Sequence, residues 1–152
     1  MNEREMLREV AVGFEYSYQH DDWITPLDEA LEGLSAVQAS WKWTPDSKCI
    51  WEIVLHLAVW NQNMVDRVRT REQSRPVEGA WPSLPPVCDE AGWEAAKERL
   101  RDALRSFEQM LETTTLDEIQ ASPYGLADLL CRLTHNGYHL GQISKMREWM
   151  AW

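Results

Sequence analysis

Apolar residues recur at three- and four-residue intervals along four long segments, and this spacing restricts the fold more than any other feature of the sequence. Because an α-helix has about 3.6 residues per turn, such spacing places the apolar side chains on one face. No segment shows the alternation of apolar and polar residues that is typical of a half-buried strand. The sequence therefore predicts an all-α protein with four long helices, at residues 3–18, 47–71, 89–111 and 124–149.

The segments between these helices predict how the helices are connected. The run T-P-L-D is typical of a helix start, so we expect a short helix from Thr25 to about Leu34, followed by a tryptophan-rich loop. From Gln73 to about Cys88, prolines and a glycine exclude regular structure. These 16 residues can extend over about 50 Å, enough to return along a helix of about 30 Å, so the flanking helices can be parallel. We therefore expect an up-down-down-up four-helix bundle with a long proline-rich crossover between its second and third helices.

Length, charge and cysteine content exclude several classes of protein. At 152 residues, the chain is expected to form a single domain over residues 1–152. Its 25 acidic against 15 basic residues give a net charge of −10, so we expect no nucleic-acid partner. The densest apolar run, residues 53–60, is far shorter than the roughly 20 residues of a membrane span, and the first ten residues lack the apolar core of a signal peptide. Three cysteines without a C-x-x-C motif suit a reducing compartment, so we expect a cytoplasmic protein.

Three of the four histidines indicate a metal site. His135 and His139 are four residues apart, so their imidazoles share one helical face and can bind one ion. His56 interrupts the apolar run of residues 53–60, where an unpaired buried imidazole would cost about 1–3 kcal/mol. A metal ion shared with the other two rings would supply the missing partner. Two alternatives stay open: the pair can lie on an exposed face by chance, and His56 can hydrogen-bond to a neighbouring group.

The last predicted helix, residues 124–149, has two different faces on a helical wheel. One face, which we interpret as facing the core, consists of leucines: Leu126, Leu129, Leu130, Leu133 and Leu140. The other mixes polar and aromatic side chains, as the wall of a cleft does: Asp128, Cys131, His135, Tyr138, His139, Gln142, Met146 and Trp149. His56 lies on a comparable face of residues 47–71. Two half-sites can therefore meet across the bundle.

Two histidine-bearing motifs stand out in the sequence. Residues 51–60 read W-E-I-V-L-H-L-A-V-W, and residues 135–143 read H-N-G-Y-H-L-G-Q-I. Together they resemble the DinB/YfiT-like family of metalloenzymes, and the stretches P-L-D-E-A-L-E-G-L-S and S-K-C-I-W are also similar to its members, so the resemblance extends from about Trp23 onward. It implies an up-down-down-up four-helix bundle that is frequently dimeric. It also implies a divalent ion, usually zinc or nickel, that is held by three histidines, by position His56, His135 and His139.

A metal ion bound by three histidines has at least one open coordination position, which distinguishes catalytic sites from closed structural ones. Water bound there becomes more acidic, and a thiol binds as thiolate. The resemblance favours the thiol, because it implies relatives that are transferases and isomerases using low-molecular-weight thiols. We therefore expect a metal-dependent enzyme for a small-molecule substrate, with thiol-dependent transfer as the leading reaction and metal-dependent hydrolysis as the alternative. A non-catalytic, stress-related metal-binding protein and an interaction module with structural histidines are two further hypotheses.

Several other residues are candidates for supporting roles. Glu52, one turn before His56, is a candidate catalytic residue that orients this ring, accepts a proton from bound water or ligates the ion itself, although an acid early in a helix also stabilises the helix dipole. Gln142 is a second catalytic candidate that hydrogen-bonds to bound water or substrate, or else it makes a plain interhelical hydrogen bond. Cys131 would suit zinc or serve as a small apolar residue, and His20 is expected to be exposed or to cap a helix. Tryptophans of the connecting segments are candidates for an apolar substrate pocket: Trp23, Trp41, Trp43 and Trp81.

The predicted helix that carries His56 is more apolar than one bundle face requires. Residues 50–60 are apolar around much of the helix circumference. We therefore expect a homodimer that buries the surplus along residues 47–71 and 124–149.

Overall fold

The structure, a computed structural model of the chain, describes residues 2–20 and 24–150. Within these ranges it contains seven helices and no strand, which confirms the all-α fold. Four helices are long: α1 (Glu3–Tyr16), α4 (Ile50–Thr70), α5 (Glu90–Thr113) and α7 (Gly125–Trp149). Three are short: α2 (Leu27–Leu31), α3 (Ala36–Ser40) and α6 (Leu116–Ala121). None of the helices in the described ranges has the length and hydropathy needed to cross a bilayer.

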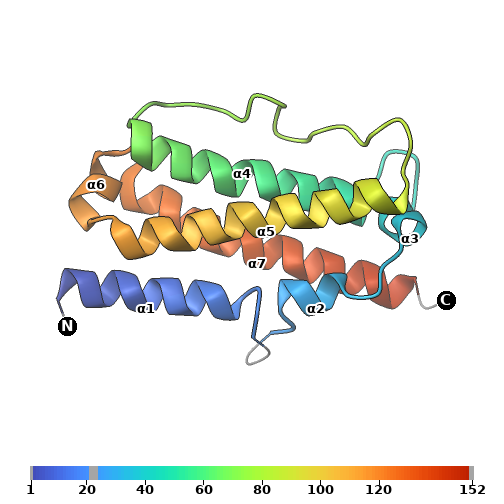
Figure 1. Cartoon of the computed structure of the whole chain (residues 1–152), viewed down its shortest axis with the longest axis horizontal. Coiled ribbons are helices and arrows are strands. Elements are labelled where there is room, and N and C mark those ends of the chain that lie inside the picture. The colour runs from blue at the N-terminus through green and yellow to red at the C-terminus, as the bar shows by residue number, and fades with distance from the viewer. Residues whose placement is uncertain (1, 21–23, 151–152) are drawn as a thin grey trace.

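The four long helices form a bundle in which two neighbours are parallel. In Figure 1, α4 and α5 run in the same direction, whereas α1 and α7 run in the opposite direction. Residues 71–89 make this possible, because they pass along the bundle from the end of α4 to the start of α5. We call this segment the crossover. The short helices α2 and α3 lie near the C-terminal end of α7, and α6 joins α5 to α7 at the other end of the bundle.

The core is tightly packed between α4 and α5. Trp51 and Trp93 are fully buried there, with ring centroids 5.4 Å apart. The indole Nε1 of Trp93 donates a 2.7 Å hydrogen bond to the carbonyl of Leu34, so the polar atom of this ring has a partner despite its burial. Gly92 allows the close packing, because a Cβ at this position would lie 3.3 Å from the Trp51 ring.

The start of α4 differs from the prediction. The helix begins at Ile50 with Cys49 as its N-cap, rather than after a cap at Ser47. The Ser47 hydroxyl is engaged elsewhere, because it accepts a hydrogen bond from the Thr44 amide and donates one to the Thr44 carbonyl. The Glu52 carboxylate accepts a 3.2 Å hydrogen bond from the Cys49 amide instead. A local turn therefore takes the serine away from the helix end.

Two other predicted ends are also corrected. α1 ends at Tyr16 rather than Tyr18, because the carbonyls of the next two residues accept hydrogen bonds from the first two amides of α2. α2 ends at Leu31 rather than Leu34, and Gly33 then turns the chain with a φ of 71° that favours glycine. In both places, contacts with the following segment end the helix before its apolar pattern does.

The helices α3 and α6 are absent from the sequence prediction, although each begins with a capping box. Ser35 and Gln38 cap α3 reciprocally, and Thr115 and Glu118 do the same for α6. Both helices are too short to show a full apolar period. The S-x-x-Q and T-x-x-E patterns are the sequence signals that would have found them.

The helix α4 is enclosed by the rest of the chain. Every residue from 50 to 59 is buried, and α3, α5 and α7 pack against this helix. Its apolar circumference is therefore covered without a second copy, so the homodimer stays a prediction without support from α4. The leucine face of α7 is only partly in the core: Leu129 is buried, but Leu126 and Leu130 are 36% and 55% exposed.

Candidate metal centre

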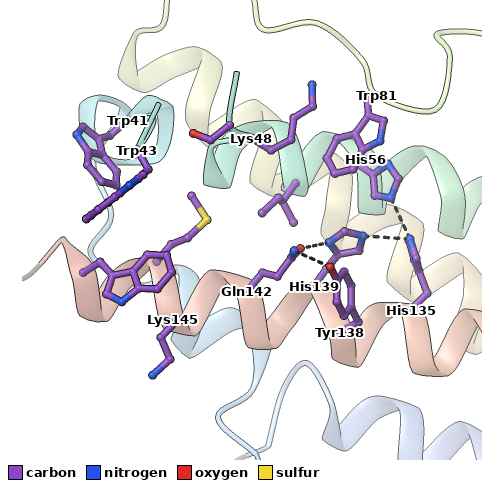
Figure 2. A pocket seen from close by; sticks show the side chains of 14 residues that line it. Trp41, Trp43, Lys48, His56, Trp81, His135, Tyr138, His139, Gln142 and Lys145 are labelled. Carbon is purple, nitrogen blue, oxygen red and sulfur yellow. Dashed lines mark hydrogen bonds between the residues drawn. The ribbon is translucent and has the colours of Figure 1, made fainter. Parts of the chain in front are cut away.

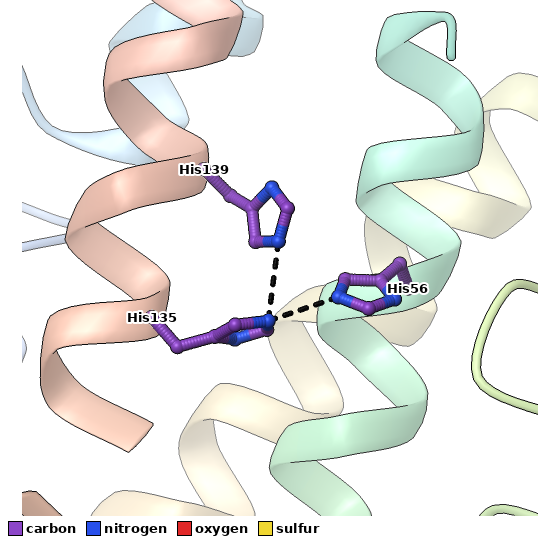
Figure 3. A group of neighbouring side chains, drawn as sticks. All are labelled: His56, His135 and His139. Atoms are coloured by element: carbon purple, nitrogen blue, oxygen red, sulfur yellow. Dashed lines mark hydrogen bonds between the residues drawn. The ribbon is translucent and has the colours of Figure 1, made fainter. Parts of the chain in front are cut away.

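Three imidazoles meet where α4 and α7 face each other (Figure 2 and Figure 3). His56 extends from α4, and His135 and His139 extend from successive turns of α7. The Nε2 atom of His135 lies 2.9 Å from Nε2 of His56 and 3.1 Å from Nε2 of His139. One ligand atom from each ring lies within 4.8 Å of the others. These three side chains, separated by up to 83 positions in the sequence, are thus close enough to hold one metal ion.

The hydrogen bonds of two Nδ1 atoms, in His56 and His139, determine that the Nε2 atoms of these rings face the centre. Nδ1 of His56 donates a 2.5 Å hydrogen bond to the carbonyl of Ala80, and Nδ1 of His139 donates a 2.6 Å hydrogen bond to Oε1 of Gln142. Both acceptors are carbonyl oxygens, so both Nδ1 atoms carry the proton and both Nε2 atoms present a lone pair. A single proton on Nε2 of His135 can satisfy only one of these lone pairs. A cation would satisfy all three nitrogens, so the donor set fits a metal ion.

Burial keeps the three rings neutral near pH 7. Loss of hydration lowers the pKa of His56 from 6.5 to about 4 and that of His135 to about 3, and it also lowers the pKa of His139. A metal ion binds the neutral imidazole, because the bond uses the nitrogen lone pair. The centre therefore needs no deprotonation at neutral pH before it binds an ion.

The crossover contributes directly to the centre. Besides the carbonyl of Ala80, it carries Trp81, whose ring stacks on His56 with centroids 3.8 Å apart and an interplanar angle of 16°. Arg67 on α4 holds the beginning of the crossover by donating hydrogen bonds of 3.0 and 2.8 Å to the carbonyl of Ser74. The orientation of His56 therefore depends on a segment outside the bundle helices.

A pocket of about 650 Å³ opens beside the three histidines (Figure 2). Its wall comes from the loop after α3, the start of α4, the crossover and the second half of α7. The predicted tryptophans Trp41, Trp43 and Trp81 all line it, and Trp149 joins them from α7. The fourth candidate, Trp23, lies outside the described residues. The three histidines thus border a space that admits a small molecule.

The family comparison agrees with this arrangement. A family model described as the DinB superfamily matches residues 23–143. The chain belongs to the DinB superfamily. The match includes all three histidines of the centre and confirms the resemblance noted in the two histidine motifs. Among curated proteins and among solved structures, no match to the chain was found.

In this DinB-superfamily protein, Glu52 does not orient His56. Its carboxylate lies 2.8 Å from Nζ of Lys42 and 2.9 Å from Nζ of Lys48, and it does not line the pocket. Burial opposes ionisation of Glu52, but hydrogen bonds from Lys42 and Lys48 outweigh it and lower the pKa of the carboxyl to about 2. The carbonyl of Ala80 takes the orienting role that was predicted for Glu52.

The other predicted residues have different surroundings. Gln142 lines the pocket and contacts His139, and its Nε2 donates a 3.0 Å hydrogen bond to the Tyr138 hydroxyl. Cys131 is exposed and lies outside the histidine cluster. His20 is exposed and pairs with Glu15 at 3.3 Å. Of these candidates, Gln142 alone contacts the histidine cluster, through its hydrogen bond with His139.

Sequence reasoning missed four contributors to the site. The carbonyl of Ala80 gives no sequence signal, because every residue has one. Lys48 and Lys145 line the pocket, and the guanidinium of Arg132 lies 3.5 Å from Nδ1 of His135. The position of Arg132, one turn before His135 on the polar side of α7, is the signal that could have identified it.

Proposed function

We propose that this protein is a divalent-metal-dependent enzyme that transfers a low-molecular-weight thiol. The observation that carries the proposal is the convergence of three neutral imidazoles beside an open pocket. Imidazole nitrogens suit zinc and nickel, and three ligands leave room for a further one. When bound, such an ion would supply Lewis acidity, which activates a thiol or a water molecule.

The composition of the pocket wall favours the thiol over water. Among the described residues, those that line the pocket include no Asp or Glu. Activation of water in metal-dependent hydrolysis is commonly assisted by a carboxylate base. A thiol has a pKa of about 8.5 and needs far less assistance than water, whose pKa is about 15.7. The described part of the pocket wall therefore offers no carboxylate base for hydrolysis, whereas thiol transfer does not require one.

Residues of the chain position the centre and its substrate. The carbonyl of Ala80 and the amide of Gln142 hold the protons of His56 and His139 on Nδ1. The Tyr138 hydroxyl accepts a hydrogen bond from Gln142, so its own proton is available for a substrate atom in the pocket. Tyr138 thus suits a role in binding the substrate rather than the ion.

The first test is the metal content of protein purified without an affinity tag. We expect one zinc or nickel ion per chain in the wild type, loss of the ion in His135→Ala, and retention of the ion in His20→Ala. His20 is the matched control, because it is the histidine outside the cluster. Elemental analysis of the three proteins measures the metal content per chain. A metal-free wild type, or equal metal content in His135→Ala, would refute the metal centre.

The second test addresses the thiol. Cobalt-substituted protein should gain a sulfur-to-cobalt charge-transfer band when glutathione is added, and S-methylglutathione should produce none because its sulfur cannot become a thiolate. Absorption spectroscopy reads both samples. Cobalt-loaded protein that gives no such band with glutathione or cysteine would contradict thiol transfer and leave the metal centre standing.

We also propose that the protein is a homodimer in which α7 contributes to the interface. Leu130 and Leu126 support this, because they are one turn apart and remain exposed on α7. Light scattering at micromolar concentration should give twice the mass of the chain, and Leu130→Glu should shift the protein toward the monomer. A wild-type monomer would contradict the proposal.

A further inference from the structure

We infer that the substrate combines an apolar, ring-sized body with a negatively charged group, and that different parts of the pocket wall bind the two. The inference rests on the proposed function only in taking the histidine end as the place of reaction. It is carried by the positions of exposed tryptophans and of two lysines around the pocket.

The end of the pocket away from the histidines is aromatic. In Figure 2, Trp41 and Trp43 lie on the opposite side of the pocket from His56 and His135. Trp43 contacts Trp149 with ring centroids 5.6 Å apart, although 106 positions separate them in the sequence. Tertiary structure therefore brings together an aromatic wall that no local pattern contains.

These indoles remain open to solvent. Trp43 is 65% exposed and Trp149 is 58% exposed, although both line a pocket. Large aromatic side chains usually bury most of their surface, and an exposed pair in a concave wall is typical of a site that stacks on a ligand ring. The end with Trp43 and Trp149 thus fits an apolar body of aromatic size.

The charges in the pocket wall have one sign. Lys48 and Lys145 line the pocket, and none of the described lining residues is acidic, although the whole chain has a net charge of −10. An apolar wall strengthens the field of such charges because it lowers the local dielectric constant. A bound divalent ion would add to the positive potential. An anionic substrate group is therefore favoured in this pocket, and a cationic group is disfavoured.

The partners of the two lysines leave charge available to a ligand. Nζ of Lys48 lies 2.9 Å from Glu52, but the same carboxylate also pairs with Lys42, so two ammonium groups share one acid. Lys48 also lies over the ring of Trp81, with Nζ 5.1 Å from the centroid. Lys145 pairs with Glu148, which does not line the pocket. Both lysine side chains are about half exposed, at 43% and 53%, and can turn toward a ligand.

The order of the tryptophans, Lys48 and the histidines along the pocket predicts how the substrate lies in it. Figure 2 shows Lys48 between the Trp41 and Trp43 end and the histidine end of the pocket. An apolar body stacked on Trp43 would therefore bring its charged group to Lys48, and the remaining end of the molecule would reach His139. The inferred substrate is an aromatic or similarly bulky apolar carboxylate.

The test compares three probes that share one ring and one chain length: phenylbutyrate, phenylbutanol and phenylbutylamine. Calorimetric titration of zinc-loaded protein should show that the acid binds about tenfold more tightly than the alcohol, because a hydrogen bond to a charged group is worth about that factor. The amine should bind most weakly. Equal affinity for acid and alcohol would overturn the inference.

Variants of the pocket residues test which side chain binds the charged group of the probe and which binds its ring. Lys48→Met should weaken acid binding about tenfold and leave alcohol binding unchanged, because only the acid uses the charge. Trp43→Ala should weaken both probes alike by about three- to tenfold, because both use the ring. Arg8→Met is the matched control, since it removes one exposed cation from α1, away from the pocket. If Lys48→Met behaves like Arg8→Met, the lysine is not the anion site and the inference is refuted.

A chelator-treated sample separates the inference from the proposed function. The preference for the acid should persist there, because it depends on Lys48 rather than on an ion. A preference that disappears with the ion would overturn the assignment to lysine. Zinc titration of the same sample reports on the metal centre independently: failure to bind zinc with a retained, Lys48-dependent preference would refute the proposed function and support the substrate class.

Discussion

Arg67 connects the stability of the bundle to the geometry of the histidine cluster. Its guanidinium lies on α4 with the side chain only 7% exposed, and NH1 pairs with Asp128 on α7 at 2.9 Å. The same guanidinium donates two hydrogen bonds to the carbonyl of Ser74 in the crossover. One side chain therefore joins three segments, including the one that carries the Ala80 carbonyl to His56.

The expected cost of Arg67→Met follows from these contacts. Removing one partner of a buried ion pair costs about 3–5 kcal/mol, because the other charge stays buried without compensation. Asp128 is 12% exposed and has a second, longer contact with Arg132 at 3.9 Å, which offsets part of the loss. We therefore expect the lower end of the range, about 3 kcal/mol. For a chain of this size, that loss lowers the melting temperature by roughly 10 °C.

Urea denaturation followed by circular dichroism measures the effect on metal-free protein. Arg67→Lys is the matched variant, since it keeps the charge but loses the fork that reaches Ser74, and it should cost about half as much. In a double-mutant cycle with Asp128→Asn, the double variant should be about 2 kcal/mol more stable than the sum of the single effects predicts. A loss below about 1 kcal/mol for Arg67→Met, or strict additivity in the cycle, would refute the reasoning.

Three other predictions concern the centre and its surroundings. Gln142→Leu removes the acceptor for Nδ1 of His139 and should weaken zinc binding about 10- to 100-fold in a chelator competition, whereas Gln142→Glu should not; equal affinity of the leucine variant would contradict this. In metal-free protein, the lowered pKa of His56 means that the unfolded state binds more protons below pH 6.5, so stability should fall by about 3 kcal/mol from this ring as the pH drops toward about 4. Urea titrations across this range should show a shallower dependence in His56→Phe, and equal slopes would exclude the effect. The lowered pKa of Glu52 stabilises the fold above pH 4.5, and this stability is lost as the pH falls toward about 2. Because its lysine partners are partly exposed, Glu52→Gln should lower the free energy of unfolding by only about 1–2 kcal/mol at pH 7. Denaturation at neutral and at acidic pH should show that the difference in free energy of unfolding between variant and wild type becomes smaller in acid.

Features that depend on neighbouring residues were predicted from the sequence. The four long helices follow from apolar spacing, and the start of α5 follows from Asp89, whose side chain accepts a hydrogen bond from Gly92. The pairing of His135 with His139 follows from helical geometry, because residues four apart face the same way. A predicted helix boundary was wrong where a side chain had a competing hydrogen-bond partner, as Ser47 has in the carbonyl of Thr44.

Contacts between distant segments were decided by the tertiary structure. His56 was a candidate ligand because an imidazole in an apolar run needs a partner, but only the packing of α4 against α7 brings it to His135. Glu52 pairs with Lys42 and Lys48 from the segment before α4, and the Ala80 carbonyl of the crossover orients the ring of His56 instead. The sequence by itself thus determined the helices and singled out the three histidines as candidate ligands. The tertiary structure decided that the Ala80 carbonyl orients His56 and which groups line the pocket, because these contacts depend on the paths of the crossover and of the loop after α3, and a backbone carbonyl looks the same at every position of the sequence.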